Sequence, residues 1–172
     1  MFRSIKALIS DLVGDARPRV QDGYNSWLAT AALLTRVATV HREMSEARRE
    51  KLHAILKSSF GLDDRIAAQL IEQSAAIDRN AIDLYHFTRQ LNEVLDDEGR
   101  SRTVRMMWEI VYADGSVNEF ESNLIWRAAD LLGVSSRQRV ELRQLVSAEN
   151  TELSCAGVGG PRSLGLATIV GN

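Results

Sequence analysis

The sequence is poor in the residues that mark many kinds of functional site. Its 172 residues include one cysteine, Cys155, so no disulfide can form within the chain and no thiolate cluster can bind a metal. A single thiol is typical of a reducing compartment, and we expect a cytoplasmic protein. No stretch approaches the roughly 20 consecutive apolar residues of a membrane span. The net charge of −2 provides no broad positive field, and we therefore expect no nucleic-acid partner.

Proline is also scarce, and no long stretch alternates between apolar and polar residues as a β-strand does. The two prolines, Pro18 and Pro161, lie outside the segments with helical periodicity. An interior proline would cost a helix about 3 kcal/mol, so the region between them can be almost continuously helical. Apolar residues recur at helical spacing throughout that region. The sequence predicts an all-α fold, a single domain of about seven to eight helices.

The pattern divides the chain into three parts. Residues 1–23 contain an amphipathic helix at 2–13, a linker at 14–19 and a break at Gly23. That helix either caps the core or makes a peripheral membrane contact. Residues 24–148 form the helical domain, in which Ser26 is the expected N-cap of the first helix. Residues 149–172 are expected to be a flexible tail, because the glycine-rich stretch around Gly157 abandons the helical pattern.

Several helix boundaries are specified by local residues. Ser45 is expected to cap a helix that ends at Gly61, a residue suited to the left-handed conformation at a helix C-terminus. Asp63 or Asp64 can start the next helix. Further along, Gly133 ends one helix and Ser135 or Ser136 caps the last one. These signals predict where the helices turn.

Two segments of the chain are similar to each other. Residues 33–65 align with residues 106–137 at an offset of 73, which falls to 72 near the end. We therefore expect two related three-helix halves, with their polar turns in comparable environments. The copies differ at the turn, where Glu121 aligns with Arg48 and Asp114 aligns with His41. If the turn of the second copy binds a cation, the first copy has lost the means to do so.

The turn of the second copy is rich in oxygen ligands. Asp114, Asn118 and Glu121 offer hard donors suited to calcium or magnesium, and the further candidate ligands are Ser116 and Glu119. A purely structural interpretation is equally concrete. Asn118 and Glu121 have the spacing of a capping box, Asp114 can make an Asx turn, and the glycine that follows it can supply a positive φ.

The residues of this turn resemble a known family. The segment from Tyr112 to Ile125, together with the helix end at residues 131–134, is similar to the second-half signature of the tellurite-resistance B (TerB-like) family. The resemblance covers roughly residues 24–148. It implies an all-helical domain of two related halves, with a divalent metal near the acidic turn. It also implies an adaptor role in the response to stress or tellurite, without an enzymatic reaction.

Three classes of function remain. The first, which we expect, is a non-enzymatic cytoplasmic adaptor that binds an unidentified protein partner and a calcium or magnesium ion. The second is an enzyme of unknown reaction that uses clustered carboxylates, for which Asp96, Asp97 and Glu98 are further acids to consider. These three acids are also typical of a solvated helix N-terminus. The third is a structural helical module that forms a homodimer.

Overall fold

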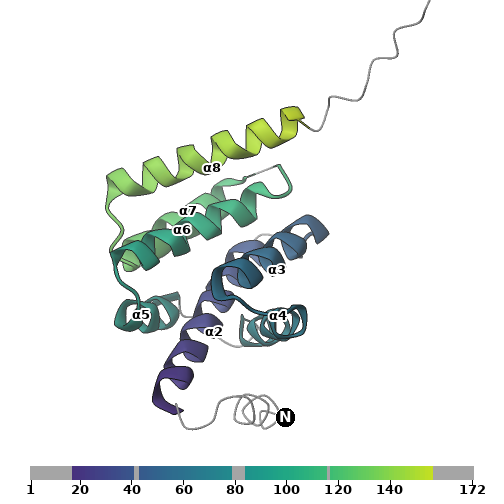
Figure 1. Cartoon of the computed structure of the whole chain (residues 1–172). Coiled ribbons are helices and arrows are strands. Elements are labelled where there is room, and N and C mark those ends of the chain that lie inside the picture. Colours follow the sequence, from purple (N-terminus) through teal and green to yellow (C-terminus); the bar gives the residue numbers. More distant parts are fainter. Residues whose placement is uncertain (1–16, 41–42, 79–83, 116, 157–172) are drawn as a thin grey trace, which may run out of the picture.

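The computed structural model describes residues 17–40, 43–78, 84–115 and 117–156. These residues form seven α-helices and no strand, which confirms the all-α prediction. The amphipathic helix predicted at residues 2–13 lies outside them, and so does its proposed membrane contact. The helices in Figure 1 are α2 (Arg17–Thr39), α3 (Glu46–Phe60), α4 (Asp64–Asp78), α5 (Leu84–Val94), α6 (Asp97–Tyr112), α7 (Glu119–Leu131) and α8 (Ser136–Ala156).

Helix α2 is the central element of the fold. It packs against α3, α4, α5, α6 and α7. Between residues 29 and 38 nearly every side chain is buried, so the helix is enclosed on all sides rather than along one stripe. Alanines at 29, 31, 32 and 38 let neighbouring helices approach its axis closely. The end of this helix is thereby fixed in the interior of the molecule, beside α3 and α6.

The second half of the described chain is a layer of three helices. Helices α6, α7 and α8 lie alongside one another in Figure 1, and α8 packs mainly on α6. Trp108 is fully buried in α6, where its ring contacts those of Tyr112 and Trp126 at centroid distances of 6.1 and 5.9 Å. The guanidinium of Arg143 from α8 lies 5.2 Å from the centre of the Trp108 ring. These ring contacts hold α6 against α7 and α8.

The predicted helix boundaries around the repeated segments are confirmed. Ser45 is the N-cap of α3, and Gly61 follows that helix with φ 64°. The carboxylate of Asp63 accepts a hydrogen bond of 2.8 Å from the backbone N–H of Ile66 at the start of α4. Gly133 follows α7 with φ 73°. The arrangement into two three-helix halves stays a prediction, although the caps recur at the offset that the repeat predicts.

At the start of the domain, the sequence-based boundaries are wrong. Helix α2 begins at Arg17, so residues 17–19 and Gly23 are helical, and Ser26 lies inside the helix instead of capping it. Pro18 is compatible with this start because the first backbone N–H groups of a helix have no partner within it. Gly23 weakens an isolated helix by about 1 kcal/mol, but the buried run that follows supplies ample packing energy. The boundary predicted at residues 23 and 24 is therefore not a break.

At the other end, helix α8 continues further than predicted. It runs to Ala156, so residues 149–156 are helical rather than part of a flexible tail. Two contacts support this extension: Arg105 of α6 donates to Glu149 at 2.9 Å, and the hydroxyl of Thr151 donates to the carbonyl of Ser147. No glycine or proline interrupts the helix before Gly157. Residues 157–172 lie outside the described part of the chain.

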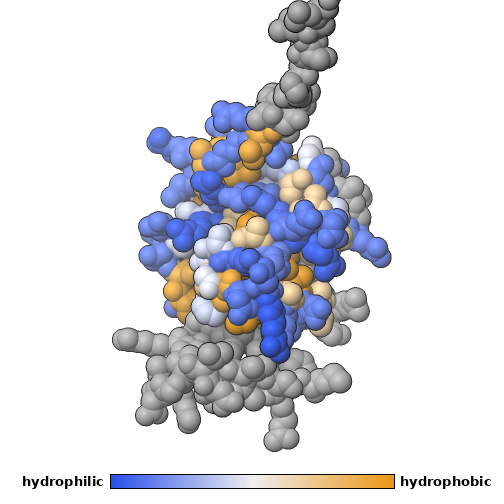
Figure 2. Space-filling view, turned by 45° about the vertical axis from the view of Figure 1, so that its right-hand side comes forward, coloured by the Kyte–Doolittle hydropathy of each residue, from blue (hydrophilic) through white to orange (hydrophobic). Residues whose placement is uncertain are grey.

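The surface of the described residues is mixed in character. Figure 2 shows hydrophilic side chains over most of one face, with apolar side chains scattered between them. Within the described segments, no helix has both the length and the apolar character to cross a membrane. The large apolar side chains that are exposed belong to several helices: Tyr85, Val94, Phe120, Val140, Leu145 and Leu153.

Candidate functional site

The predicted oxygen-rich turn connects α6 to α7. Its sharp bend is made at Gly115, whose φ of 77° is favourable for glycine and whose N–H donates to the carbonyl of Tyr112 at 3.0 Å. The predicted capping box is present. The Asn118 side chain accepts a hydrogen bond of 2.9 Å from the Glu121 N–H, and the Glu121 carboxylate accepts one of 3.1 Å from the Asn118 N–H. Both side chains therefore stabilise the start of α7.

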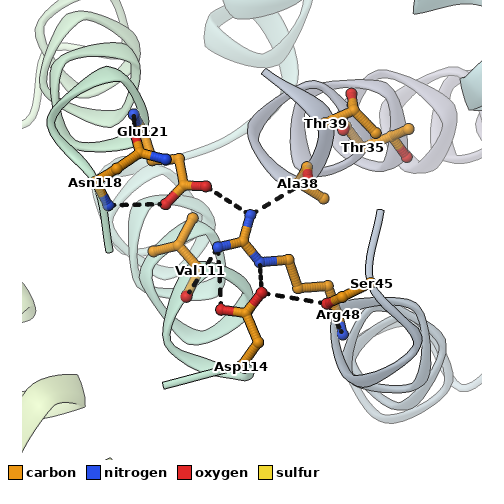
Figure 3. A network of polar contacts seen from close by, with 9 residues as sticks. All are labelled: Thr35, Ala38, Thr39, Ser45, Arg48, Val111, Asp114, Asn118 and Glu121. Atoms are coloured by element: carbon orange, nitrogen blue, oxygen red, sulfur yellow. Dashed lines mark hydrogen bonds and ion pairs between the residues drawn. The ribbon is translucent and has the colours of Figure 1, made fainter. Parts of the chain in front are cut away.

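A cation of the protein itself lies between the two acids of this turn. Arg48 projects from the first turn of α3, and its side chain is only 1% exposed. Its Nη1 atom lies 2.7 Å from Oε1 of Glu121, which is also 1% exposed. Its Nε atom lies 2.9 Å from Oδ2 of Asp114, and its Nη2 donates to Oδ1 of the same carboxylate at 3.2 Å. Figure 3 shows the guanidinium held between the two carboxylates.

The guanidinium also donates to two backbone carbonyls at helix ends. Nη1 lies 3.3 Å from the carbonyl oxygen of Ala38, near the end of α2, and Nη2 lies 3.3 Å from that of Val111, near the end of α6. Carbonyls in the last turn of a helix carry partial negative charge, which favours a cation. One side chain thus connects α3 to the ends of α2 and α6 and to the start of α7.

The carboxylate of Asp114 has a further partner at the N-cap of α3. The hydroxyl of Ser45 donates to its Oδ2 at 3.2 Å and accepts a hydrogen bond of 3.3 Å from the Arg48 N–H. Each of the four carboxylate oxygens of Asp114 and Glu121 therefore has a partner within the protein.

Arg48 is permanently charged in this environment. Its burial alone would lower its pKa, but the hydrogen bond and the charge of Glu121, followed by those of Asp114, outweigh the burial and raise the pKa above its usual value. The ordinary pKa of arginine is already far above neutrality. The two acids consequently face a positive charge at every pH at which the protein is normally handled.

Only some of the candidate metal ligands lie close to one another. Asp114, Asn118 and Glu121 do come together, while Glu119 is exposed on the first turn of α7 and Ser116 lies outside the described residues. Within the described part of the chain, no three His, Cys, Asp or Glu side chains form a group that could hold a metal ion. A divalent ion does not fit the arrangement, because the ligand oxygens already serve Arg48 and the helix cap. Metal binding at this turn stays a prediction, one that requires Arg48 to move.

Sequence reasoning did not assign Arg48 to this site. The alignment of the two copies pairs Arg48 with Glu121, and the mismatch was interpreted as a loss of ligands in the first copy. The informative signal was that the paired residues have opposite charges. If equivalent positions of two packed copies lie near each other, an arginine in one and a glutamate in the other predict an ion pair.

The other acidic cluster is a helix N-terminus. Asp96 is the N-cap of α6, and its carboxylate accepts a hydrogen bond of 2.8 Å from the Gly99 N–H. Asp97 pairs with Arg100 one turn further along the helix. Both contacts are those expected of acids that begin a helix. The described geometry gives these carboxylates a structural role.

The fold and this turn define a class: all-helical modules with an acidic corner between two amphipathic helices. A family model described as tellurite resistance protein TerB matches residues 27–144. The match covers well over half of the chain, includes both Arg48 and the acidic turn, and confirms the resemblance seen in the sequence. The chain belongs to the TerB family. No match was found among curated proteins or among solved structures.

Proposed function

We propose that the protein is a non-enzymatic cytoplasmic adaptor, which acts in the response to tellurite or a related stress by binding a partner protein. Family membership supports the connection with tellurite resistance. The single observation that favours an adaptor over an enzyme is the closed state of the acidic corner. A general base must reach a substrate proton, and a carboxylate that is held by a buried guanidinium is shielded from one.

The test is survival of the source organism on tellurite. Deletion of the gene should lower the tellurite concentration that the cells tolerate, and expression of the intact chain should restore it. An Asp114→Asn variant separates the two classes, because an adaptor needs only the fold whereas a carboxylate-dependent enzyme needs the acid. We expect this variant to restore tolerance at a temperature at which circular dichroism shows it to be folded.

Two results would contradict the proposal. Tolerance that is unaffected by the deletion would remove the connection with tellurite. A folded Asp114→Asn variant that fails to restore tolerance would favour the enzyme that uses carboxylates.

The third class, a homodimer without another partner, is tested by light scattering of the purified chain and by chemical cross-linking in cells. An adaptor should be cross-linked to a second protein, and a structural dimer only to another copy of the chain.

A further inference from the structure

Arg48 and Glu121 occupy equivalent positions in the two similar segments. Ser45 is the N-cap of α3 and Asn118 is the N-cap of α7, and they are related by the offset of the repeat. Each cap accepts a hydrogen bond from the backbone N–H of the third residue of its helix, which is Arg48 in α3 and Glu121 in α7. The ion pair of 2.7 Å therefore joins two matching helix positions that are 73 residues apart.

The two side chains use that position in opposite ways. Glu121 completes the capping box of its own helix by accepting the Asn118 N–H. A guanidinium has no acceptor atom, so Arg48 cannot do the same for α3 and instead crosses to the other segment. Its guanidinium is surrounded by two carboxylates and the Val111 carbonyl of that segment and by the Ala38 carbonyl of its own segment. Calcium and magnesium ions in proteins are bound by oxygen atoms of the same kinds.

We infer that the guanidinium of Arg48 is the resident cation of this acidic corner and takes the place of a divalent metal ion. A metal at Asp114 and Glu121 would have to displace a side chain that is 1% exposed and leave its positive charge without partners. It would also compete for Glu121 Oε2 and Asn118 Oδ1, which hold the start of α7. The corner is thereby closed to exchangeable ions.

The charge at position 48 should decide whether the corner needs a metal ion. In an Arg48→Glu variant, three carboxylates would face one another at the corner, an arrangement that repels itself without a cation. Such a variant should become dependent on a divalent ion, although the wild-type chain is not. The inference does not rest on the proposed adaptor role, because it concerns the folded chain alone and is read from unfolding rather than from growth on tellurite.

The experiment measures the thermal unfolding of the purified full chain in a chelator and in millimolar calcium, magnesium or manganese. The melting temperature of the wild-type protein should be the same in all four conditions. Arg48→Glu should melt lower in the chelator, by on the order of 10 °C, and should recover a substantial part of that loss with at least one of the ions. Arg49→Glu is the matched control, since it makes the same change of charge at the next, exposed position of α3. It should melt near the wild-type temperature and respond to none of the ions.

Calorimetric titration of the wild-type chain with the same three ions keeps the inference open to contradiction even if Arg48→Glu does not fold. Binding heat that disappears in an Asp114→Asn variant would overturn it, because the corner would then accept a metal with Arg48 in place. A folded Arg48→Glu variant that gains nothing from any ion would overturn it as well. Absence of such heat, together with a lowered melting temperature of Arg48→Gln, would support it.

Discussion

Arg48 and Glu121 make a direct ion pair in the interior although 73 residues separate them in the chain. Both side chains are 1% exposed, whereas Asp114, the second partner of the guanidinium, is 16% exposed. Removing one member of a buried pair leaves the other charge without compensation, which costs more than the pair itself contributes. Solvent partly screens the contact between Arg48 and Asp114, whereas it does not reach the contact between Arg48 and Glu121. The two acids should therefore differ in their importance to stability.

Glu121→Gln is expected to lower the free energy of unfolding by about 3 kcal/mol, and Asp114→Asn by about 1–2 kcal/mol. Urea denaturation of the three proteins measures both differences. Glu119→Gln is the control, because it removes a carboxylate from the same turn at an exposed position and should change stability by no more than about 0.5 kcal/mol. Equal losses for Glu121→Gln and Asp114→Asn would show that burial does not set the strength of these contacts.

The pH dependence of stability should reflect the permanence of the Arg48 charge. The pKa of Arg48 is raised in the folded protein, so its contribution is fully present below the unfolded-state pKa and is lost only as the pH rises through the raised value. That range lies above any ordinary working pH. An Arg48→Lys variant should instead lose stability once the pH rises above about 10, because the ordinary pKa of lysine is about 10.4. Melting temperatures across a pH series test this, and an alkaline loss of the same size in the wild-type protein would contradict it.

Gly115 should be difficult to replace because of its backbone and not because of its surroundings. Its φ is 77°, and a Cβ atom built at this position would meet no other atom within 4 Å. Gly115→Ala is therefore expected to cost about 1–2 kcal/mol through conformational strain alone. Gly115→Asn should cost less, since asparagine tolerates the left-handed region better. Chemical denaturation ranks the two, and an equal loss for both would indicate steric crowding instead.

The contact between Arg105 and Glu149 is expected to hold the end of α8 without adding much to global stability. Both side chains are more than a third exposed, so solvent screens the pair and Glu149→Gln should cost less than about 1 kcal/mol in overall unfolding. Hydrogen exchange of the amides at residues 149–156 should nevertheless accelerate, because this part of the helix would lose a tether to α6. Glu152→Gln, an exposed change on the same helix, should leave exchange unaltered.

The sequence was sufficient wherever a boundary depends on neighbouring residues. Ser45, Asn118 and Gly133 were all predicted correctly, since capping and left-handed turns are decided within a few residues. The start of α2 was not, because Pro18 and Gly23 read as breaks while the packing that outweighs them comes from distant helices. The end of α8 was underestimated for the same reason. Capping residues, glycine and proline indicate the conformation that a segment favours in isolation. Packing against other helices can extend a helix past the weaker of these signals.

The chemistry of the corner was predicted only in part. The sequence identified the right acids and their capping box, but an ion pair across 73 residues depends on how the two segments pack. Periodicity gives the buried face of each helix without giving the partner of a particular side chain. The opposite charges at the aligned positions carried that information. To predict the ion pair from these charges, one must assume that the two similar segments contact each other at equivalent positions.

The ion pair between the first turns of α3 and α7 also limits which substitutions this protein can accept during evolution. Each of the two residues, Arg48 and Glu121, has its partner in the other segment, so an altered charge in one is harmful until the second has altered too. The two similar segments can therefore no longer replace each other. Relatives that differ from this chain at position 48 should also differ at position 121.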